Sequence, residues 1–196
     1  MDTIFIQKIV KDGVFFMELK DSETFKNLHA AWAGETQARA KYDYFAKKAK
    51  KQGLEPIAKV FELTAKNEHA HGKIWFEMIM NGIGETNENL QNGIDGEHYE
   101  WTEMYKNFAA KAREEGFNLI AEKFEAVAKI ESMHEQRYKM MLDQLNSDKV
   151  YKRDKQTVWI CSNCGYVHTS DQAPDACPVC YHPKSYFEEE CANSSL

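Results

Sequence analysis

The sequence has no long apolar run and no excess of basic residues. Its 196 residues include 25 lysines and arginines against 31 aspartates and glutamates, and the two signs are interspersed along the chain. No stretch approaches the ~18 apolar residues that suggest a membrane-spanning helix, and no basic segment precedes an apolar one at the N-terminus. The sequence therefore argues against a membrane protein, a secreted protein and a nucleic-acid-binding protein.

Cysteine is scarce and unevenly placed. Four of the five cysteines form two close pairs near the C-terminus, and Cys191 stands alone. A disulfide framework would usually spread cysteines through a small secreted chain. Paired cysteines instead indicate a metal site in a reducing compartment, so we expect a cytoplasmic protein in which Cys191 is a free thiol.

Most of the chain is predicted to be helical. Apolar residues recur at three- and four-residue spacing over residues 22–146, which is typical of amphipathic helices. Breaks are expected at Gly53 and Gly116, and a longer connection is expected over about residues 81–96, so that the third helix would begin at Glu97. Four helices joined in this way predict a mainly α fold built on a four-helix bundle.

The remaining segments differ in composition. Residues 1–21 hold two runs rich in Ile, Val and Phe around Asp12 and Gly13, a pattern typical of a β-hairpin, although a short strand or an additional helical turn fits as well. Residues 147–157 are polar and predict a linker. Residues 158–191 are rich in cysteine, proline and tyrosine and predict a small second domain, followed by a tail over residues 192–196.

An internal repeat relates the two halves of the helical region. A shift of 63 residues superimposes aromatic, glycine, glutamate and histidine positions: Tyr42 on Tyr105, Phe45 on Phe108, Gly53 on Gly116, Phe61 on Phe124, Glu68 on Glu131 and His71 on His134. Each half is therefore predicted to be a helical hairpin of the same design. Two such hairpins would place matching residues across a pseudo-two-fold axis.

Glutamates and histidines lie inside these helices at the spacing of metal ligands. The pattern Glu-x-x-His occurs twice, and it places both side chains on one helix face. Helical di-iron proteins combine two such pairs with a glutamate from each of the other two helices, and oxygen and imidazole ligands suit iron or manganese. The candidate ligands are Glu68 with His71, Glu131 with His134, and the glutamates Glu35, Glu97 and Glu100.

Charge also favours bound metal at these positions. Unpaired carboxylates inside a helical core would each cost several kcal/mol, whereas two divalent cations would offset most of their charge. The alternative is that they are surface glutamates, which are common in a chain with 29 % charged residues. Two Glu-x-x-His pairs in register with the repeat favour the metal site. Tyr42 and Tyr105 are predicted either to hydrogen-bond the ligand carboxylates or to be core aromatics.

The four paired cysteines predict a second metal site. Two Cys-x-x-Cys turns direct four thiolates at one tetrahedral metal, which can be zinc or a single iron. Aromatic residues are concentrated around them, and this favours a rubredoxin-like iron centre over a zinc ribbon. The cysteines are Cys161, Cys164, Cys177 and Cys180, and the aromatic residues are Trp159, Tyr166, Tyr181, Tyr186 and Phe187.

Taken together, these motifs resemble rubrerythrin. The segments that carry the resemblance are Ala33-Gly-Glu-Thr-Gln-Ala-Arg39, Gly96-Glu-His-Tyr-Glu100, Glu131-x-x-His134 and the four cysteines. The resemblance implies a ferritin-like di-iron bundle with the seven candidate ligands named above, followed by a rubredoxin-like domain that binds one iron through four cysteines. It also implies that one iron moves with oxidation state, exchanging Glu100 for His71.

The resemblance further implies a function. The expected activity is that of a non-haem peroxidase that reduces hydrogen peroxide to water in defence against oxidative stress, with electrons relayed through the Fe(Cys)4 site. The expected electron donor is rubredoxin or an NAD(P)H-dependent flavoprotein reductase, and the expected assembly is a homodimer or higher homo-oligomer. The alternatives are a ferroxidase or iron-storage protein, an O2-reducing oxidase, and a non-enzymatic protein with a zinc ribbon.

Overall fold

A computed structural model describes residues 18–190 of the protein. The expected N-terminal β-hairpin, centred on Asp12 and Gly13, lies outside this range, as does Cys191. Within the described range no helix is long and apolar enough to cross a membrane. The chain divides into two units, with the boundary between Gly84 and Glu85.

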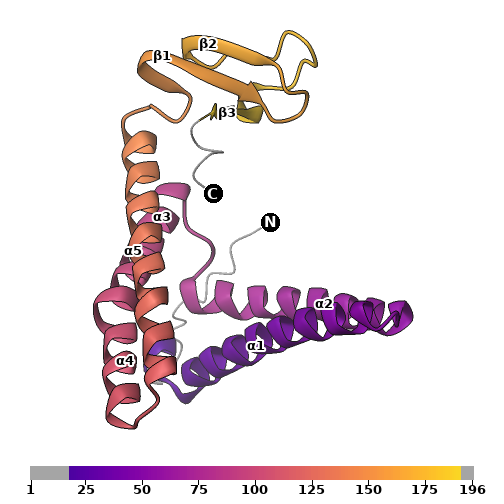
Figure 1. Ribbon diagram of the computed structural model, residues 1–196, viewed down its shortest axis with the longest axis vertical. Coiled ribbons are helices and arrows are strands. Elements are labelled where there is room, and N and C mark those ends of the chain that lie inside the picture. The colour runs from indigo at the N-terminus through magenta and orange to yellow at the C-terminus, as the bar shows by residue number, and fades with distance from the viewer. Residues whose placement is uncertain (1–17, 191–196) are drawn as a thin grey trace, which may run out of the picture. The chain divides into compact units, whose positions relative to one another are not determined.

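The first unit is a helical hairpin. A 3-10 turn, η1 (Leu19–Asp21), precedes α1 (Glu23–Lys51), which is followed by α2 (Glu55–Met80) (Figure 1). The Ser22 side chain caps α1 by accepting a hydrogen bond of 3.1 Å from the Phe25 amide. Gly53 follows α1 with a φ of +74°, and Pro56 lies in the first turn of α2, as the sequence predicts. The residues buried along this hairpin are small, which lets the helices approach closely: Ala46, Ala49, Ala58, Ala65 and Gly72.

The second unit begins with a second helical hairpin. It contains α3 (Thr86–Tyr99), the π-helical turn η2 (Glu100–Met104), α4 (Tyr105–Glu114) and α5 (Asn118–Asn146). The expectation that the third helix begins at Glu97 is wrong, because α3 already begins at Thr86. The Glu88 side chain caps the start of α3 by accepting a 2.8 Å hydrogen bond from the Glu85 amide. Gly93 lies inside this helix. Glycine is favoured there because a Cβ would lie 3.1 Å from the Tyr138 ring.

Both hairpins contain the same aromatic cluster, which supports the internal repeat. In the first, the ring centroids of Tyr42 and Phe61 are 6.1 Å apart and those of Phe45 and Phe61 are 5.6 Å apart. In the second, the corresponding distances are 5.9 Å between Tyr105 and Phe124 and 5.6 Å between Phe108 and Phe124.

The π-helical turn marks a one-residue difference between the two halves. Glu97 follows Glu35 by 62 residues, whereas Tyr105 follows Tyr42 by 63. One residue has therefore been added between these positions in the second hairpin, and η2 lies there. Such turns are rare and occur frequently at functional sites.

The C-terminal part of the second unit is a small three-stranded antiparallel sheet. Its strands are β1 (Lys152–Cys161), β2 (Val167–Gln172) and β3 (Phe187–Glu189), in the order β2-β1-β3, with a 3-10 turn η3 (Lys184–Tyr186) before β3. Its buried cluster consists of Trp159, Cys161, Ala173, Cys177 and Phe187. The mainly α fold with a small cysteine-bearing β domain matches the predicted fold class.

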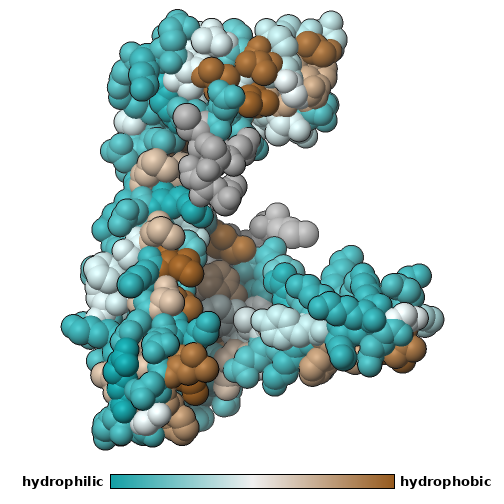
Figure 2. Space-filling model, viewed as in Figure 1, coloured by the Kyte–Doolittle hydropathy of each residue, from teal (hydrophilic) through white to brown (hydrophobic). Residues whose placement is uncertain are grey.

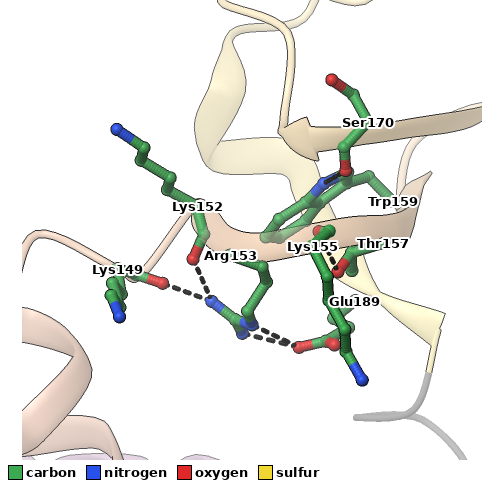
Figure 3. Close-up of polar contacts among 8 residues, drawn as sticks. All are labelled: Lys149, Lys152, Arg153, Lys155, Thr157, Trp159, Ser170 and Glu189. Carbon is green, nitrogen blue, oxygen red and sulfur yellow. Dashed lines mark hydrogen bonds and ion pairs between the residues drawn. The ribbon is translucent and has the colours of Figure 1, made fainter.

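Strand β1 begins inside the range that the sequence suggests is a linker. Arg153 explains this early start, as Figure 3 shows: its Nε and Nη2 donate hydrogen bonds of 2.9 and 2.6 Å to Glu189 on β3. Its guanidinium also lies 5.3 Å from the centre of the Trp159 ring and donates to the carbonyls of Lys149 and Lys152. The Arg153 side chain thus fixes the beginning of β1, a segment whose polar composition does not indicate a strand.

Each helical hairpin leaves an apolar surface exposed, and the exposed residues correspond in the repeat. Phe45 and Phe108 are each 47 % exposed, and Ile57 and Ile120 are each 48 % exposed. In Figure 2, brown patches of hydrophobic residues are visible over the part of the second unit formed by α4 and α5. Matching exposed surfaces of this kind mark places where a helical hairpin packs against another element.

Candidate metal centres

The first candidate half-site lies on the α1–α2 hairpin. Glu35 comes from α1, and Glu68 and His71 come from successive turns of α2. The Nδ1 atom of His71 lies 2.9 Å from a Glu68 oxygen and 3.9 Å from a Glu35 oxygen. One donor atom from each of the three side chains lies within 4.8 Å of the others, which is close enough for a single cation to bind all three.

The second candidate half-site repeats this arrangement on the other hairpin. Glu97 comes from α3, and Glu131 and His134 come from α5. The Nδ1 atom of His134 lies 2.7 Å from Glu131 and 3.5 Å from Glu97, and the three donor atoms again lie within 4.8 Å of one another. The two half-sites have the same composition and order. The repeat predicts their Glu-x-x-His pairs, whereas Glu97 follows Glu35 by 62 residues and not 63.

Glu100 and the two tyrosines, Tyr42 and Tyr105, lie outside the two groups of three donor residues. Glu100 is the first residue of η2 and does not belong to the group formed by Glu97, Glu131 and His134, but its charge acts on that group. Burial is the main cause that raises the pKa of the Tyr105 hydroxyl, and the charges of Glu100, Glu131 and Glu97 raise it further. The charges of these carboxylates therefore act on the Tyr105 hydroxyl. The rings of both tyrosines pack in the aromatic clusters, Tyr42 against Phe45 and Phe61 and Tyr105 against Phe108 and Phe124.

The donor set fits two iron ions. Each half-site offers two carboxylates and one imidazole, a combination that suits iron and manganese. Without a cation the second half-site is electrostatically unfavourable. Burial raises the pKa of Glu97, and the charges of Glu131 and Glu100 add to this effect, while His134 opposes it. A divalent ion would remove the repulsion that raises this pKa.

The raised pKa of Glu97 predicts how the stability of the metal-free protein depends on pH. The folded state favours protonated Glu97, so above the ordinary value of 4.5 it binds more protons than the unfolded state. The stabilising contribution of this group is therefore expected to be present at low pH and to be lost as pH rises through the raised pKa. Urea unfolding of chelator-treated protein between about pH 4.5 and 7 tests this. Glu97→Gln should flatten the dependence, and an unchanged profile in that variant would contradict the assignment.

The second candidate metal centre, separate from the two half-sites, consists of the four cysteines of the β domain. The Sγ atoms of Cys161 and Cys180 are 3.7 Å apart and those of Cys164 and Cys177 are 3.6 Å apart. All four sulfur atoms lie within 4.8 Å of one another. This is the closed, all-thiolate donor set that a single iron or zinc takes.

The two Cys-x-x-Cys turns are built alike. The Gly165 amide donates a 2.8 Å hydrogen bond to the Cys161 carbonyl, and the Tyr181 amide donates one of 2.9 Å to the Cys177 carbonyl. Gly165 and Tyr181 both have a positive φ, at +76° and +61°. The turns thus reverse the chain tightly and leave backbone amides directed at the sulfur atoms.

The pKa values of two of these thiols, those of Cys164 and Cys180, are shifted in opposite directions. The amide of His182 is the largest of the causes that lower the pKa of Cys180 to about 5. The amide of Tyr166 acts in the same sense on Cys164, but burial and the hydrogen bonds with the other three thiols outweigh it and raise the pKa of Cys164 to about 12. The site therefore holds thiolate character unevenly until a metal takes all four sulfurs.

Tyr181 occupies a backbone conformation that glycine adopts more easily. Its φ is +61°, and its side chain is 82 % exposed, so few contacts compensate for the strain. We expect Tyr181→Gly to raise the stability of the metal-loaded β domain by about 0.5–1 kcal/mol, because left-handed backbone costs a side-chain-bearing residue about 1–2 kcal/mol and glycine loses part of that gain as chain entropy. Thermal unfolding measures the change. Gly165→Ala, at the equivalent position, should lower stability, and stabilisation by that variant would contradict the explanation.

Four residues outside the candidate ligand set form a further polar cluster. Glu135 on α5 is 4 % exposed, and it accepts hydrogen bonds from Trp101 and pairs with His98 and Lys139. The hydrogen bond from Lys139 is the main cause that lowers the pKa of Glu135, and those from Trp101 and His98 add to it against the effect of burial. The available signal was weak: a glutamate beside the candidate ligand His134 resembles the many surface glutamates of the chain.

A helical protein with paired carboxylate–histidine groups and a separate four-thiolate site belongs to the class of non-haem iron proteins. Comparison with known families identifies it further. The rubrerythrin family profile matches residues 26–142 and 88–159, and the profile of the rubrerythrin rubredoxin-like domain matches residues 159–188. The chain belongs to the rubrerythrin family.

Two rubrerythrins of other organisms agree with this assignment. The chain is 45 % identical to rubrerythrin from Porphyromonas gingivalis, over 87 % of this chain and 91 % of the relative. It is 42 % identical to rubrerythrin from Nitratidesulfovibrio vulgaris, over 87 % of this chain and 95 % of the relative. A solved structure of nigerythrin in a partially reduced state is 32 % identical over 96 % of this chain and all of that one, with a TM-score of 0.34. A di-iron centre and an Fe(Cys)4 site, the expected cofactors, match both the family and the donor groups.

Proposed function

We propose that this protein is a peroxidase that reduces hydrogen peroxide to water. The observation that supports it most is the presence, in one chain, of two matched Glu-Glu-His half-sites and a separate four-thiolate site. A metal pair suited to two-electron chemistry and a carrier of single electrons are the two parts that peroxide reduction with a one-electron donor requires.

The proposal includes one di-iron centre made from both half-sites. Its ligands are Glu35, Glu68, His71, Glu97, Glu100, Glu131 and His134. The equal exposure of Phe45 and Phe108, and of Ile57 and Ile120, supports packing of the two hairpin types against each other in a ferritin-like bundle. This packing would bring together two groups of ligands that each offer only three close donor atoms.

When bound, the iron pair would supply the two electrons that reduce one peroxide, with two protons, to two waters, and the Fe(Cys)4 iron would replace them one at a time. The chain's own groups have distinct roles in this. Glu68 and His71, and likewise Glu131 and His134, lie 2.9 and 2.7 Å apart and would each offer a carboxylate and an imidazole to a common ion. The Tyr105 hydroxyl, whose raised pKa keeps it protonated, can donate a hydrogen bond to the ligand carboxylates.

The four-cysteine site distinguishes a peroxidase from an iron-storage protein. A ferroxidase passes electrons from iron directly to the oxidant and has no need for a second redox site in the same chain. An Fe(Cys)4 site accepts one electron from a donor, which we propose to be rubredoxin or an NAD(P)H-dependent flavoprotein reductase. We also propose that the protein forms a homodimer or higher homo-oligomer. Each subunit would contain the helical domain of residues 22–146 and the cysteine-bearing domain that begins with β1 at Lys152.

The test is a stopped-flow experiment on the fully reduced, iron-loaded protein. Mixing with hydrogen peroxide without oxygen should produce the visible absorption of the ferric four-cysteine site in step with peroxide loss. Steady turnover with reduced rubredoxin should consume two electrons per peroxide and should be faster with peroxide than with O2. Absence of the ferric signal, faster turnover with O2, or accumulation of mineral iron would each contradict the proposal.

A further inference from the structure

Glu135 is a buried carboxylate that lies outside the proposed ligand set and is tied to the π-helical turn. Its Oε2 atom accepts a 2.7 Å hydrogen bond from the Trp101 indole, and its Oε1 atom lies 3.0 Å from Nδ1 of His98. Lys139 lies 2.6 Å from Oε1 on the same helix. Both carboxylate oxygens are therefore satisfied, which a buried charge requires.

The partners of Glu135 bracket the start of the turn. His98 lies two residues before Glu100 and Trp101 directly follows it, so one carboxylate on α5 holds the backbone on both sides of Glu100. The turn is closed by the Tyr105 amide, which donates to the Glu100 carbonyl five residues back. The Thr102 hydroxyl also donates a 2.6 Å hydrogen bond to the His98 carbonyl. The turn is therefore held by Glu135 from α5 and by Thr102 through the end of α3.

The other hairpin provides a natural comparison. The residue 63 positions before Glu135 is Gly72, and helix α1 contains no π turn. A Cβ at Gly72 would meet Glu35, Trp32 and Thr36 at 3.7–3.9 Å, and a groove of about 430 Å³ lies beside it. In the described chain, the inserted residue and the buried carboxylate thus occur together in the second hairpin and are both absent from the first.

We propose that Glu135 is a positioning residue that holds η2 through Trp101 and His98, so that the second hairpin keeps Glu100 in place as the additional carboxylate of the proposed di-iron centre. The inference rests on the proposed function in one respect, because Glu100 matters there as an iron ligand. The inference adds a cause for the difference between the two hairpins. The hairpin in which Glu135 anchors η2 gains a third carboxylate, Glu100, and the hairpin with Gly72 at the corresponding position does not.

Two variants test the anchor, and each is compared with a matched control. Trp101→Phe removes the indole donor and keeps an aromatic ring, and Glu135→Gln keeps the side-chain volume but removes the charge that both ring donors share. Glu125→Gln is the control, because Glu125 joins α5 to α4 through an exposed ion pair with Arg113 without touching η2. Anaerobic titration of the metal-free proteins with Fe(II) measures the two iron affinities, and hydrogen exchange measures the amides of residues 100–104.

The anchor predicts about tenfold weaker binding of one of the two irons in both test variants, with faster amide exchange confined to residues 100–104, and neither effect in the control. If both test variants bind both irons with wild-type affinity and exchange the amides of residues 100–104 at the wild-type rate, the anchoring role of Glu135 is overturned. If the wild-type protein binds fewer than two irons in its helices, the proposed function fails. The exchange experiment on the metal-free proteins still decides whether Glu135 holds the turn.

Discussion

Replacement of Glu131 by alanine is expected to remove at least one iron from the helical part of the protein and to lower peroxide turnover by roughly a hundredfold or more. Glu131 lies 2.7 Å from Nδ1 of His134 and belongs to the close donor group with Glu97. Its loss removes one proposed ligand and reduces the donor group of three to Glu97 and His134. Iron content per chain and steady-state turnover measure the two effects.

The matched control for this variant is Glu122→Ala, which removes an exposed glutamate from the same helix. It should keep the wild-type iron content and turnover. A Glu131→Ala protein that still binds two irons with normal turnover would show that Glu131 is not a ligand. The mirror variant Glu68→Ala should behave like Glu131→Ala, because the repeat gives the two glutamates the same role.

Replacement of Cys177 by alanine is expected to abolish iron binding by the β domain and to unfold it. Cys177 is 1 % exposed and belongs to a buried cluster of only five residues. A core of this size cannot stabilise so small a domain alone, and structural zinc sites of comparable domains contribute on the order of 10 kcal/mol of folding free energy. Loss of the visible ferric absorption and rapid proteolysis of residues 152–190 should follow.

The functional consequence of this variant separates the two redox sites. Turnover with an external donor should fall close to background, whereas a single reaction of the reduced helical centre with peroxide should survive. The control is Val179→Ala. Val179 lies between Cys177 and Cys180, so this variant keeps both thiols and should behave as wild type. Undiminished donor-linked turnover in Cys177→Ala would show that electrons enter the helical centre by another route.

The local motifs of both metal sites were predictable because their geometry is local. A Glu-x-x-His pair shares a helix face whatever the tertiary structure, and Glu68 with His71 is found as expected. Each Cys-x-x-Cys turn likewise holds its two thiols close together by its own backbone geometry, and the fold of the β domain brings all four sulfurs within 4.8 Å of one another. The repeat added the correspondence between the hairpins, and the structure reproduces it in the paired aromatic clusters.

Features that depend on tertiary contacts were not predictable. The start of α3 was misplaced because Gly93 reads as a helix breaker, although contact with the Tyr138 ring makes glycine the residue that fits there. The single shift of 63 residues concealed the residue inserted at η2, and the strand start at Lys152 depends on Arg153, whose partners are distant in sequence. Glu135 was missed because burial of one glutamate among many has no local signature.

The central claim is that two similar half-sites combine into one centre that holds two irons. Mössbauer spectroscopy of protein loaded with iron-57 tests it most directly, because the method counts irons and reveals magnetic coupling between them. The account predicts three irons per chain, two of them in a coupled pair with oxygen and nitrogen ligands and one in a site of four sulfurs. Two uncoupled irons in separate sites, or a helical part without iron, would contradict it.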